Sequence, residues 1–449
     1  MKEMTDVKIS IIGAGSAQFS MSLMRDVCLK EGLKGSTVCF MDVDKGRLDI
    51  VHGLATRFMG ELKANLRLEK TVEREEALKD ADFVINTALV GGHSNAETER
   101  EVGEKHGYPR GIGFGGYFHQ LKLMLSVARD MEDTCPDAWL IQAGNPVFDG
   151  CTLMTRETKT KVIGLCHGHH GAYHIASVIG LDPSKVTFQA PGVNHCIWLT
   201  DFRHNGEDAY PLIDEWIEKK AEEYWRTWDG SPLDGEMSRA AMNLYRIFER
   251  FPVGDTVQQN PTFSWWYHAD DQTMRKWFNK YGGFLSKTGW DYYLEGLSKH
   301  IDRMNQLYKD PSTPVSSEFS PKASNEQHIP IIDALVNDNE AKYQVNVPNR
   351  GALTGFADDV VVEVPGIVSG RGVQPVHVGP LPKRLTLQIL GTCVQRMELG
   401  LEAFLSQDKE ALLNMILWNH RTRSYEQAEK IMEDLLALPF NEDLKAHFR

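Results

Sequence analysis

The sequence lacks the features that mark nucleic-acid-binding, membrane and secreted proteins. Its 449 residues carry a formal net charge of −13 and no run of lysine and arginine, which argues against nucleic acid or an anionic membrane as the partner. No stretch approaches the roughly 18 apolar residues of a membrane span. The first residues, MKEMTDVKIS, lack the apolar region of a signal peptide. We therefore expect a cytoplasmic protein.

Regular cysteine spacing is also absent. Seven cysteines are scattered along the chain in an odd set, so no disulfide framework is predicted, and in a reducing compartment they are free thiols or metal ligands. The composition, with 42% hydrophobic and 25% charged residues, is that of a globular protein.

Short apolar strands alternate with helical segments in the N-terminal part. Residues 7–12 form a strand that ends in GAGSAQF, a helical pattern follows, and further strands are STVCFMDVD, ADFVINTAL, DAWLIQAGNPV and KVIGLCHG. This order predicts an α/β fold with a Rossmann-type parallel sheet, as in the lactate and malate dehydrogenase superfamily. Ligands of such sheets bind beyond the carboxyl ends of the strands, so the turns there should face one crevice.

The composition changes after about residue 193. The following segment is rich in Trp, Tyr and amphipathic helices, residues 310–328 form a Pro- and Ser-rich loop, and strands and closing helices come last. We predict a Rossmann domain over residues 1–193 and an α+β domain over residues 194–449 that completes the site. The apolar C-terminal helices favour a homodimer or homotetramer.

The GAGS turn has the context of a dinucleotide site. Gly13 and Gly15 follow a strand and open a helix, so the backbone can approach a pyrophosphate that the helix N-terminus attracts. The third glycine of the fingerprint is missing, and a tight turn without a ligand is the alternative. The residues expected to bind the cofactor are Gly13, Gly15, Ser16, Ala17, Asp42 and, at the end of a later strand, Asn86.

Asp42 indicates which dinucleotide is bound. It ends the second strand, where a carboxylate accepts a hydrogen bond from the adenosine ribose 2′-hydroxyl and repels a 2′-phosphate. NAD is therefore favoured over NADP. Lys45 and Arg47 lie close in the sequence and leave NADP as the alternative.

A cysteine and three histidines stand together in VIGLCHGHHG, directly after an apolar strand. The paired spacings of a structural zinc site are absent, and a buried thiol beside surface histidines is the plain alternative. A second turn, GVNHCIWL, places Asn194 and His195 after another apolar stretch. Cys166 and His195 together offer a thiolate and an imidazole to a divalent ion with open positions, which is what a catalytic metal needs.

The motifs GAGS, ADFVINTA, GNPV, CHGH, GVNH and GDTV, in this order, resemble those of glycoside hydrolase family 4. The likeness continues through EQHIPIIDAL, VNVPNRG, DDVVVEVP and RMELGLEAF over essentially the whole chain. CHGH is most similar to the α-glucosidase branch. The resemblance implies an α-glycosidase that uses NAD and a divalent ion, usually Mn²⁺, for oxidation at sugar C3, deprotonation at C2, elimination and water addition.

The resemblance also implies roles for individual residues. Cys166 and His195 would bind the ion, and Asp255 in GDTV would be the base at C2, with a turn acid as the alternative. His169 is expected to contact the sugar. Asn145 in GNPV and Asn194 have amides suited to sugar hydroxyls or the nicotinamide, although either asparagine could simply shape its turn.

One segment departs from the α-glucosidase branch. GYPRGIGFGGYFHQ is shortened and has no carboxylate where that branch carries an aspartate for leaving-group departure. His119 is the predicted acid instead, because an imidazole donates a proton near neutral pH; a helix-start histidine is the alternative. Arg110 and Arg350 could pair with an anionic sugar, so an α-glucuronide, α-galacturonide or sulfoquinovoside is the alternative substrate.

Two other classes of function share some of these features. A 2-hydroxy acid dehydrogenase has the Rossmann unit and an Asn-Pro turn but no metal thiolate. A non-catalytic NAD sensor would use Cys166 for redox signalling. Metal dependence and turnover of an aryl glycoside distinguish the glycosidase from both.

Overall fold

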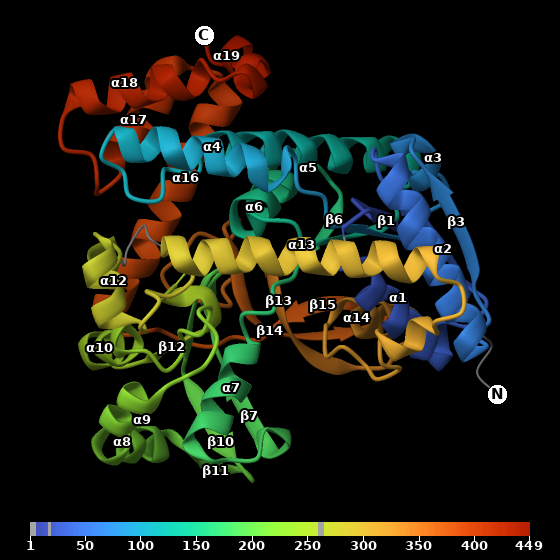
Figure 1. The fold of residues 1–449 in the computed structure, drawn as a ribbon, viewed down its shortest axis with the longest axis horizontal. Helices are drawn as coiled ribbons and strands as arrows, with labels where there is room; N and C mark the ends of the chain where they lie inside the picture. Colours follow the sequence, from blue (N-terminus) through green and yellow to red (C-terminus); the bar gives the residue numbers. More distant parts are fainter. Residues whose placement is uncertain (1–5, 17–18, 259–264) are drawn as a thin grey trace.

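A large sheet runs through the molecule in the computed structural model, which describes residues 6–16, 19–258 and 265–449 (Figure 1). Its first strands pair in parallel in the order β3-β2-β1-β4-β5-β6. This is the doubly wound order of dinucleotide-binding folds, which confirms the predicted Rossmann-type sheet. The bounds are β1 (Lys8–Ile12), β2 (Thr37–Met41), β3 (Arg67–Thr71), β4 (Phe83–Asn86), β5 (Trp139–Gln142) and β6 (Lys161–Gly164).

Buried strands can be recognised in the sequence as apolar runs, whereas the exposed strand β3 cannot. Every residue of β2 and β4 is buried, because helices cover both faces of a parallel sheet, and such strands are continuous apolar runs. Strand β3, with the sequence RLEKT, lies at the edge of the sheet and is largely exposed. Its charged side chains protect the edge from further pairing, and they also hide it from a search for apolar runs.

The helices of this half connect the strands and pack on the sheet. The N-terminus of α2 is capped by the Asp44 carboxylate, which accepts a hydrogen bond from the Arg47 backbone amide at 3.0 Å. The helices are α1 (Ser20–Leu29), α2 (Lys45–Leu62), α3 (Arg74–Leu78), α4 (Gly92–Lys105), α5 (Phe114–Thr134), α6 (Val147–Glu157) and α7 (His170–Ile179).

The sheet continues beyond β6 as an antiparallel half. In the described residues it has 12 strands, and the order after β6 is β13-β14-β8-β9-β12, with β15 paired to β14. The bounds are β8 (Gly192–Val193), β9 (Cys196–Leu199), β12 (Phe251–Val253), β13 (Ala341–Pro348), β14 (Val361–Ser369) and β15 (Gly372–Pro375). The predicted α+β part is therefore present. The predicted boundary at residue 193 falls between two strands of this half, and the division into two domains stays a prediction.

A small sheet and further helices complete the molecule (Figure 1). The small sheet contains β7 (Val186–Gln189), β10 (Asp201–His204) and β11 (Glu207–Asp208). The helices are α8 (Tyr210–Lys219), α9 (Ala221–Thr227), α10 (Arg239–Phe248), α12 (Asp271–Trp277), α13 (Lys287–Lys309), α14 (His328–Asn337), α15 (Lys383–Leu385), α16 (Gly391–Ser406), α17 (Lys409–Trp418), α18 (Tyr425–Leu436) and α19 (Glu442–His447). Some of these helices, such as α13 and α18, pack against helices of the Rossmann half (Figure 1).

The two halves of the sheet share one core. A contiguous cluster of buried apolar side chains includes Ile9 on β1 and Val345 on β13. Arg156 on α6 also forms paired hydrogen bonds of 2.7 and 2.8 Å with the Glu398 carboxylate on α16. Within the described part of the chain, no helix combines the length and the apolar character needed to cross a membrane.

Candidate metal and catalytic site

Three potential metal ligands lie at three strand ends. One follows the last parallel strand, β6, and two lie in the antiparallel half. Cys166 follows β6, His195 lies in the turn between β8 and β9, and Asp255 lies in the 3₁₀ turn η3 (Gly254–Thr256) after β12. The donor atoms of these side chains all lie within 4.8 Å of one another. The structure thus brings the predicted ligands Cys166 and His195 together and adds Asp255, the predicted base, to the same cluster.

The geometry and chemistry of this cluster fit a divalent ion. The distance from His195 Nε2 to Asp255 Oδ2 is 3.4 Å, and both side chains are about one-fifth exposed. Metal bonds of about 2.0 to 2.6 Å can therefore reach all three groups from one point. A thiolate, an imidazole and a carboxylate leave coordination positions open for substrate oxygens.

The pKa of the Cys166 thiol also fits a site for a divalent ion. Burial raises the pKa of its thiol well above the usual value, and the negative charges of Asp255 and Glu363 raise it further. Hydrogen bonds from the Gly168 amide and the Asn194 side chain act in the opposite direction. A thiolate at this place therefore requires a nearby positive charge, which a bound divalent ion supplies.

Close backbone packing holds the loop after β6, residues 166–171 (the Cys166 loop), against residues 254–256 (the Asp255 turn). Gly254 has a φ of 58°, and a Cβ there would collide with the Gly168 carbonyl oxygen. A Cβ on Gly171 would come within 2.5 Å of the Gly254 nitrogen. Glycine at these positions lets two backbones touch, and the side chains of Cys166 and Asp255 meet as a result.

A buried hydroxyl fixes the Asp255 turn to the strand that follows His195. Thr256 is fully buried, and its Oγ1 accepts a hydrogen bond from the Ile197 amide at 2.9 Å and donates to the Val253 carbonyl at 2.6 Å. His195 itself has a φ of 61°, a left-handed conformation that is uncommon for histidine. Burial lowers the pKa of His195, which favours the neutral ring that a metal ligand must have.

The predicted substrate residues Asn194 and His169 lie next to members of the cluster. Asn194 precedes His195, and His169 contacts the Cys166 backbone. Asn194 is 7% exposed, and its Nδ2 donates to Glu363 Oε2 at 3.0 Å. His169 Nδ1 lies 3.1 Å from the Cys166 carbonyl oxygen. Burial, together with the neighbouring His170, lowers the pKa of His169 to about 3, so its ring is neutral. Their contacts with a sugar stay predictions.

The glycine turn has the tight geometry expected of a dinucleotide site. Gly13 has a φ of 81°, and a Cβ there would lie 2.5 Å from the Ala88 Cα. The Ser16 amide donates to the Gly13 carbonyl at 3.1 Å. The Asp42 Oδ2 atom accepts a hydrogen bond from the Gly15 amide at 2.8 Å, and its Oδ1 accepts one from the Asp44 amide at 2.9 Å. Ala17 lies outside the described residues.

Asn86 ends strand β4 and Asn145 follows strand β5, and they differ in how many hydrogen bonds their side chains make with the protein. Asn86 is fully buried, its Nδ2 donates to Gln142 Oε1 at 2.9 Å, and its Oδ1 accepts from the Ala88 amide at 3.2 Å. Both ends of its amide are thus used to join strand ends. Asn145 is exposed and only its carbonyl oxygen is bonded, by Gln120 Nε2 at 2.9 Å, which leaves its side chain available to a ligand.

The structure does not bring three other predicted residues to the cluster. His119 faces the C-terminal segment, with Nε2 2.9 Å from Asn441 Oδ1 and Nδ1 3.6 Å from Asp443 Oδ2. Arg110 lies in a turn with Glu104 at 3.9 Å. Arg350 is exposed, and its backbone amide donates to the Asp358 carbonyl. The acid role of His119 therefore has no support from this geometry, and the leaving-group acid is unassigned.

Sequence reasoning missed Glu363. This residue lies on β14 directly behind the cluster and is 1% exposed. Burial raises the pKa of its carboxyl to about 7, against the opposing effect of hydrogen bonds from neighbouring amides. The signal was a single charged residue in the apolar run VVVEVPGIV, which indicates a buried carboxyl with a specific partner.

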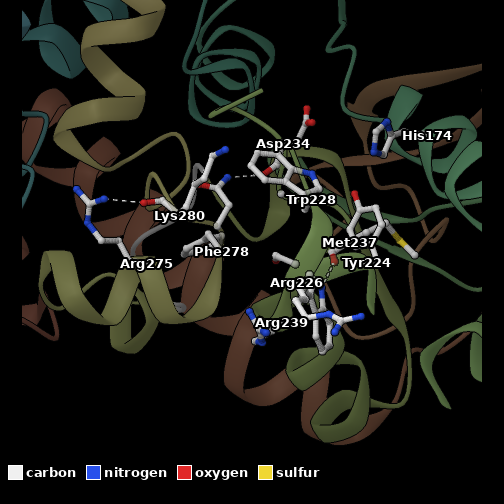
Figure 2. Close-up of a pocket in the computed structure, with 14 residues that line it drawn as sticks. His174, Tyr224, Arg226, Trp228, Asp234, Met237, Arg239, Arg275, Phe278 and Lys280 are labelled. Carbon is white, nitrogen blue, oxygen red and sulfur yellow. Dashed lines mark hydrogen bonds between the residues drawn. The ribbon is translucent and has the colours of Figure 1, made fainter. Parts of the chain in front are cut away.

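A separate cavity of about 130 Å³ lies beyond the Asp255 turn, among α7, α9, α12 and residues 228–239 (Figure 2). Its lining is aromatic and charged, and includes His174, Tyr224, Trp228, Asp234, Arg239 and Lys280. None of the three cluster residues lines it. Gln258, three residues after Asp255, donates from its Nε2 to the Leu233 carbonyl at 2.5 Å, and Leu233 directly precedes the lining residue Asp234.

A doubly wound sheet with a cysteine, a histidine and an aspartate gathered at its strand ends is the arrangement expected of a metal-dependent enzyme on a dinucleotide-binding fold. Comparison with known sequences gives the family. The profile of family 4 glycosyl hydrolases matches residues 8–180, and the profile of the C-terminal domain of that family matches residues 190–422. The chain therefore belongs to glycosyl hydrolase family 4, which confirms the predicted glycosidase class.

Relatives of the chain act on several α-linked sugars. An α-galactosidase of Bacillus subtilis is 26% identical, covering 96% of this chain and 96% of its own. An α-galacturonidase of Thermoanaerobacterium saccharolyticum is 25% identical, covering 96% of this chain and 95% of its own. The solved structure of a 6-phospho-α-glucosidase from gut microorganisms, in complex with NAD and Mn²⁺, has a TM-score of 0.78 at 17% identity and covers 99% of both chains.

Proposed function

We propose that this protein hydrolyses α-glycosides and requires NAD and Mn²⁺. The observation that carries this proposal is the cluster of Cys166, His195 and Asp255 in a family 4 chain, at the sheet edge that also carries the glycine turn. The turn follows β1 and Cys166 follows β6, and the carboxyl ends of parallel strands lie at the same edge. The solved relative with NAD and Mn²⁺ bound supports the same pair of cofactors.

Different residues would bind the cofactor, bind the ion and transfer the proton. The glycine turn and the start of the helix that follows it would hold the pyrophosphate, and Asp42 would select NAD through the ribose. Cys166 and His195 would hold the ion. When bound, NAD supplies hydride acceptance and return at sugar C3, and Mn²⁺ supplies Lewis acidity toward the neighbouring oxygen. Asp255, the third member of the cluster, would take the proton from sugar C2, because its carboxylate lies beside the other two side chains and is left to act as the base.

The main substrate we propose is an α-glucoside-like sugar, and a specific observation favours an anionic sugar as the second candidate. Relatives named α-galactosidase and α-galacturonidase are similar to this chain to almost the same degree. Both kinds of sugar therefore belong in the test.

We also propose that the protein is cytoplasmic and forms a homodimer or homotetramer. The acidic composition and scattered free cysteines support the location. Large apolar side chains exposed on the last helices, such as Leu405, Leu417 and Tyr425, support self-association.

The test is hydrolysis of p-nitrophenyl α-glucoside, α-galactoside, α-glucuronide, α-galacturonide and α-sulfoquinovoside with NAD and Mn²⁺. We expect turnover that a chelator abolishes and Mn²⁺ restores, and loss of a deuterium label from sugar C2 during cleavage. Cys166→Ser should abolish activity, whereas Cys28→Ser, a change at another free cysteine on α1, should not. Full activity in protein stripped of NAD would contradict the proposal.

A further inference from the structure

Glu363 is a buried carboxyl that no basic side chain neutralises in the described chain. It lies near the start of β14, opposite Asn346 of β13 and Gly192 of β8. The charged group that acts on it is Asp255, which is also negative. A buried acid without a cation lowers stability, and an apolar residue of similar size would avoid that cost. Its presence in an otherwise apolar strand therefore calls for a role other than core packing.

Amide side chains surround this carboxyl and connect it to the ligand strands. Asn194 Nδ2 donates to Glu363 Oε2 at 3.0 Å, and Gln344 Nε2 lies 3.5 Å from Oε1. Asn346 lies opposite Glu363 on the next strand, and its Nδ2 donates to the Gly164 carbonyl at 3.3 Å, two residues before Cys166. The network thus crosses β8, β14, β13 and β6, the strands that separate the two predicted ligands.

Asn194 occupies the key position in this network. It precedes His195 in the turn between β8 and β9, and its side chain donates to the Glu363 carboxylate at 3.0 Å. Asn194 also acts on Cys166, because its side-chain amide lowers the pKa of that thiol. A primary amide has two N–H donors, so one side chain can serve a carboxylate and a sulfur.

We propose that Glu363 is a positioning residue of the metal site, which holds the Asn194 amide against the Cys166 sulfur and so fixes the ligand thiolate and the turn that carries His195. This inference rests on the proposed function, because it assumes that Cys166 and His195 bind the ion. Residues that orient metal ligands change metal affinity by about 10- to 100-fold when they are replaced. Glu363 acts through Asn194 and is not a member of the ligand cluster.

The experiment measures Co²⁺ binding to the full-length protein through the sulfur-to-cobalt absorption in the near ultraviolet. Glu363→Gln and Asn194→Ala should each weaken Co²⁺ binding about 10- to 100-fold and alter the band. The double variant should bind no more weakly than Asn194→Ala, because both changes remove the same contact. Wild-type affinity in Glu363→Gln, or penalties that add in the double variant, would overturn the inference.

Two further variants serve as controls. Glu99→Gln tests whether loss of any buried carboxylate weakens metal binding, and Cys166→Ser tests whether the metal site exists. Glu99→Gln is the matched control, because Glu99 is another buried glutamate, 3% exposed, that accepts a hydrogen bond from an asparagine, Asn441, at 3.2 Å. It should bind Co²⁺ as the wild type does. Absence of the band in the wild type, or its persistence in Cys166→Ser, would refute the proposed metal site itself. If Glu363→Gln does not fold, wild-type affinity in Asn194→Ala alone overturns the positioning role.

Discussion

Buried histidines make the stability of this protein sensitive to acid. His268 is 4% exposed, its Nε2 lies 3.1 Å from the Val257 carbonyl oxygen, and its ring stacks on Phe278 at 4.8 Å between centroids. Burial lowers its pKa from 6.5 to about 4. The folded protein therefore keeps the ring neutral at a pH where the unfolded chain binds a proton.

The sign of the resulting pH dependence follows from this difference. The contribution of His268 to stability is present above pH 6.5 and is lost as the pH falls toward 4. We expect a loss of about 2 kcal/mol between pH 7 and pH 5 from this group. His268→Gln should remove that part of the slope in urea unfolding, whereas His420→Gln, at an exposed histidine, should leave it unchanged. Equal slopes for His268→Gln and the wild type would rule out this explanation.

At the scale of single residues, the sequence reveals groups whose chemistry is unusual and misses groups whose role depends on packing. Cys166, His195 and Asp255 stand in glycine-rich turns after apolar strands, and the structure brings them together. Glu363 and Thr256 act because of the strands packed around them, and no local pattern specifies those neighbours. His119 was predicted from its chemistry alone, without knowledge of the C-terminal segment that engages it.

At the scale of elements, the contact between two loops controls the site. Replacing Gly254 by alanine places a Cβ in a left-handed backbone and against the Gly168 carbonyl oxygen. We expect the Asp255 turn to move away from the Cys166 loop, with a loss of about 1 to 3 kcal/mol in unfolding free energy and a fall in metal affinity and turnover. Thermal unfolding and Mn²⁺ titration measure these changes.

Gly296→Ala is the control for that substitution. Gly296 lies in the exposed middle of α13, and a Cβ there would meet nothing within 4 Å. Alanine should stabilise this helix by up to about 1 kcal/mol and leave metal binding unchanged. A Gly254→Ala protein that behaves like Gly296→Ala would show that the loop contact is dispensable.

The elements themselves were largely predictable. The buried strands β1, β2, β4, β5 and β6 and the turn after β1 follow from apolar runs and glycine placement. The insertion of β13 and β14 between β6 and β8 was not predictable, because strand order depends on which edges meet in space. The sequence predicts strands within residues 343–368, but it does not show which strands they pair with.

At the scale of the whole molecule, the shared sheet links the predicted Rossmann domain to the rest of the chain. Strand β6 pairs with β13, and Arg156 on α6 binds Glu398 on α16. We expect full-length protein to unfold in one cooperative transition. A fragment of residues 1–193 should show no cooperative transition, because it exposes the β6 edge and the apolar surface beneath it. Calorimetry of both proteins measures this, and a fragment that melts cooperatively and binds NAD would contradict the expectation.

The position of β13 and β14 in the sheet also sets the order in which the site can form during synthesis. Cys166, His195 and Asp255 are all translated before the first residue of β13, Ala341. A nascent chain of that length carries every ligand of the cluster but not the strand pair that spaces them. The hairpin that ends at Ser369 must therefore be translated before this spacing of the three side chains can form.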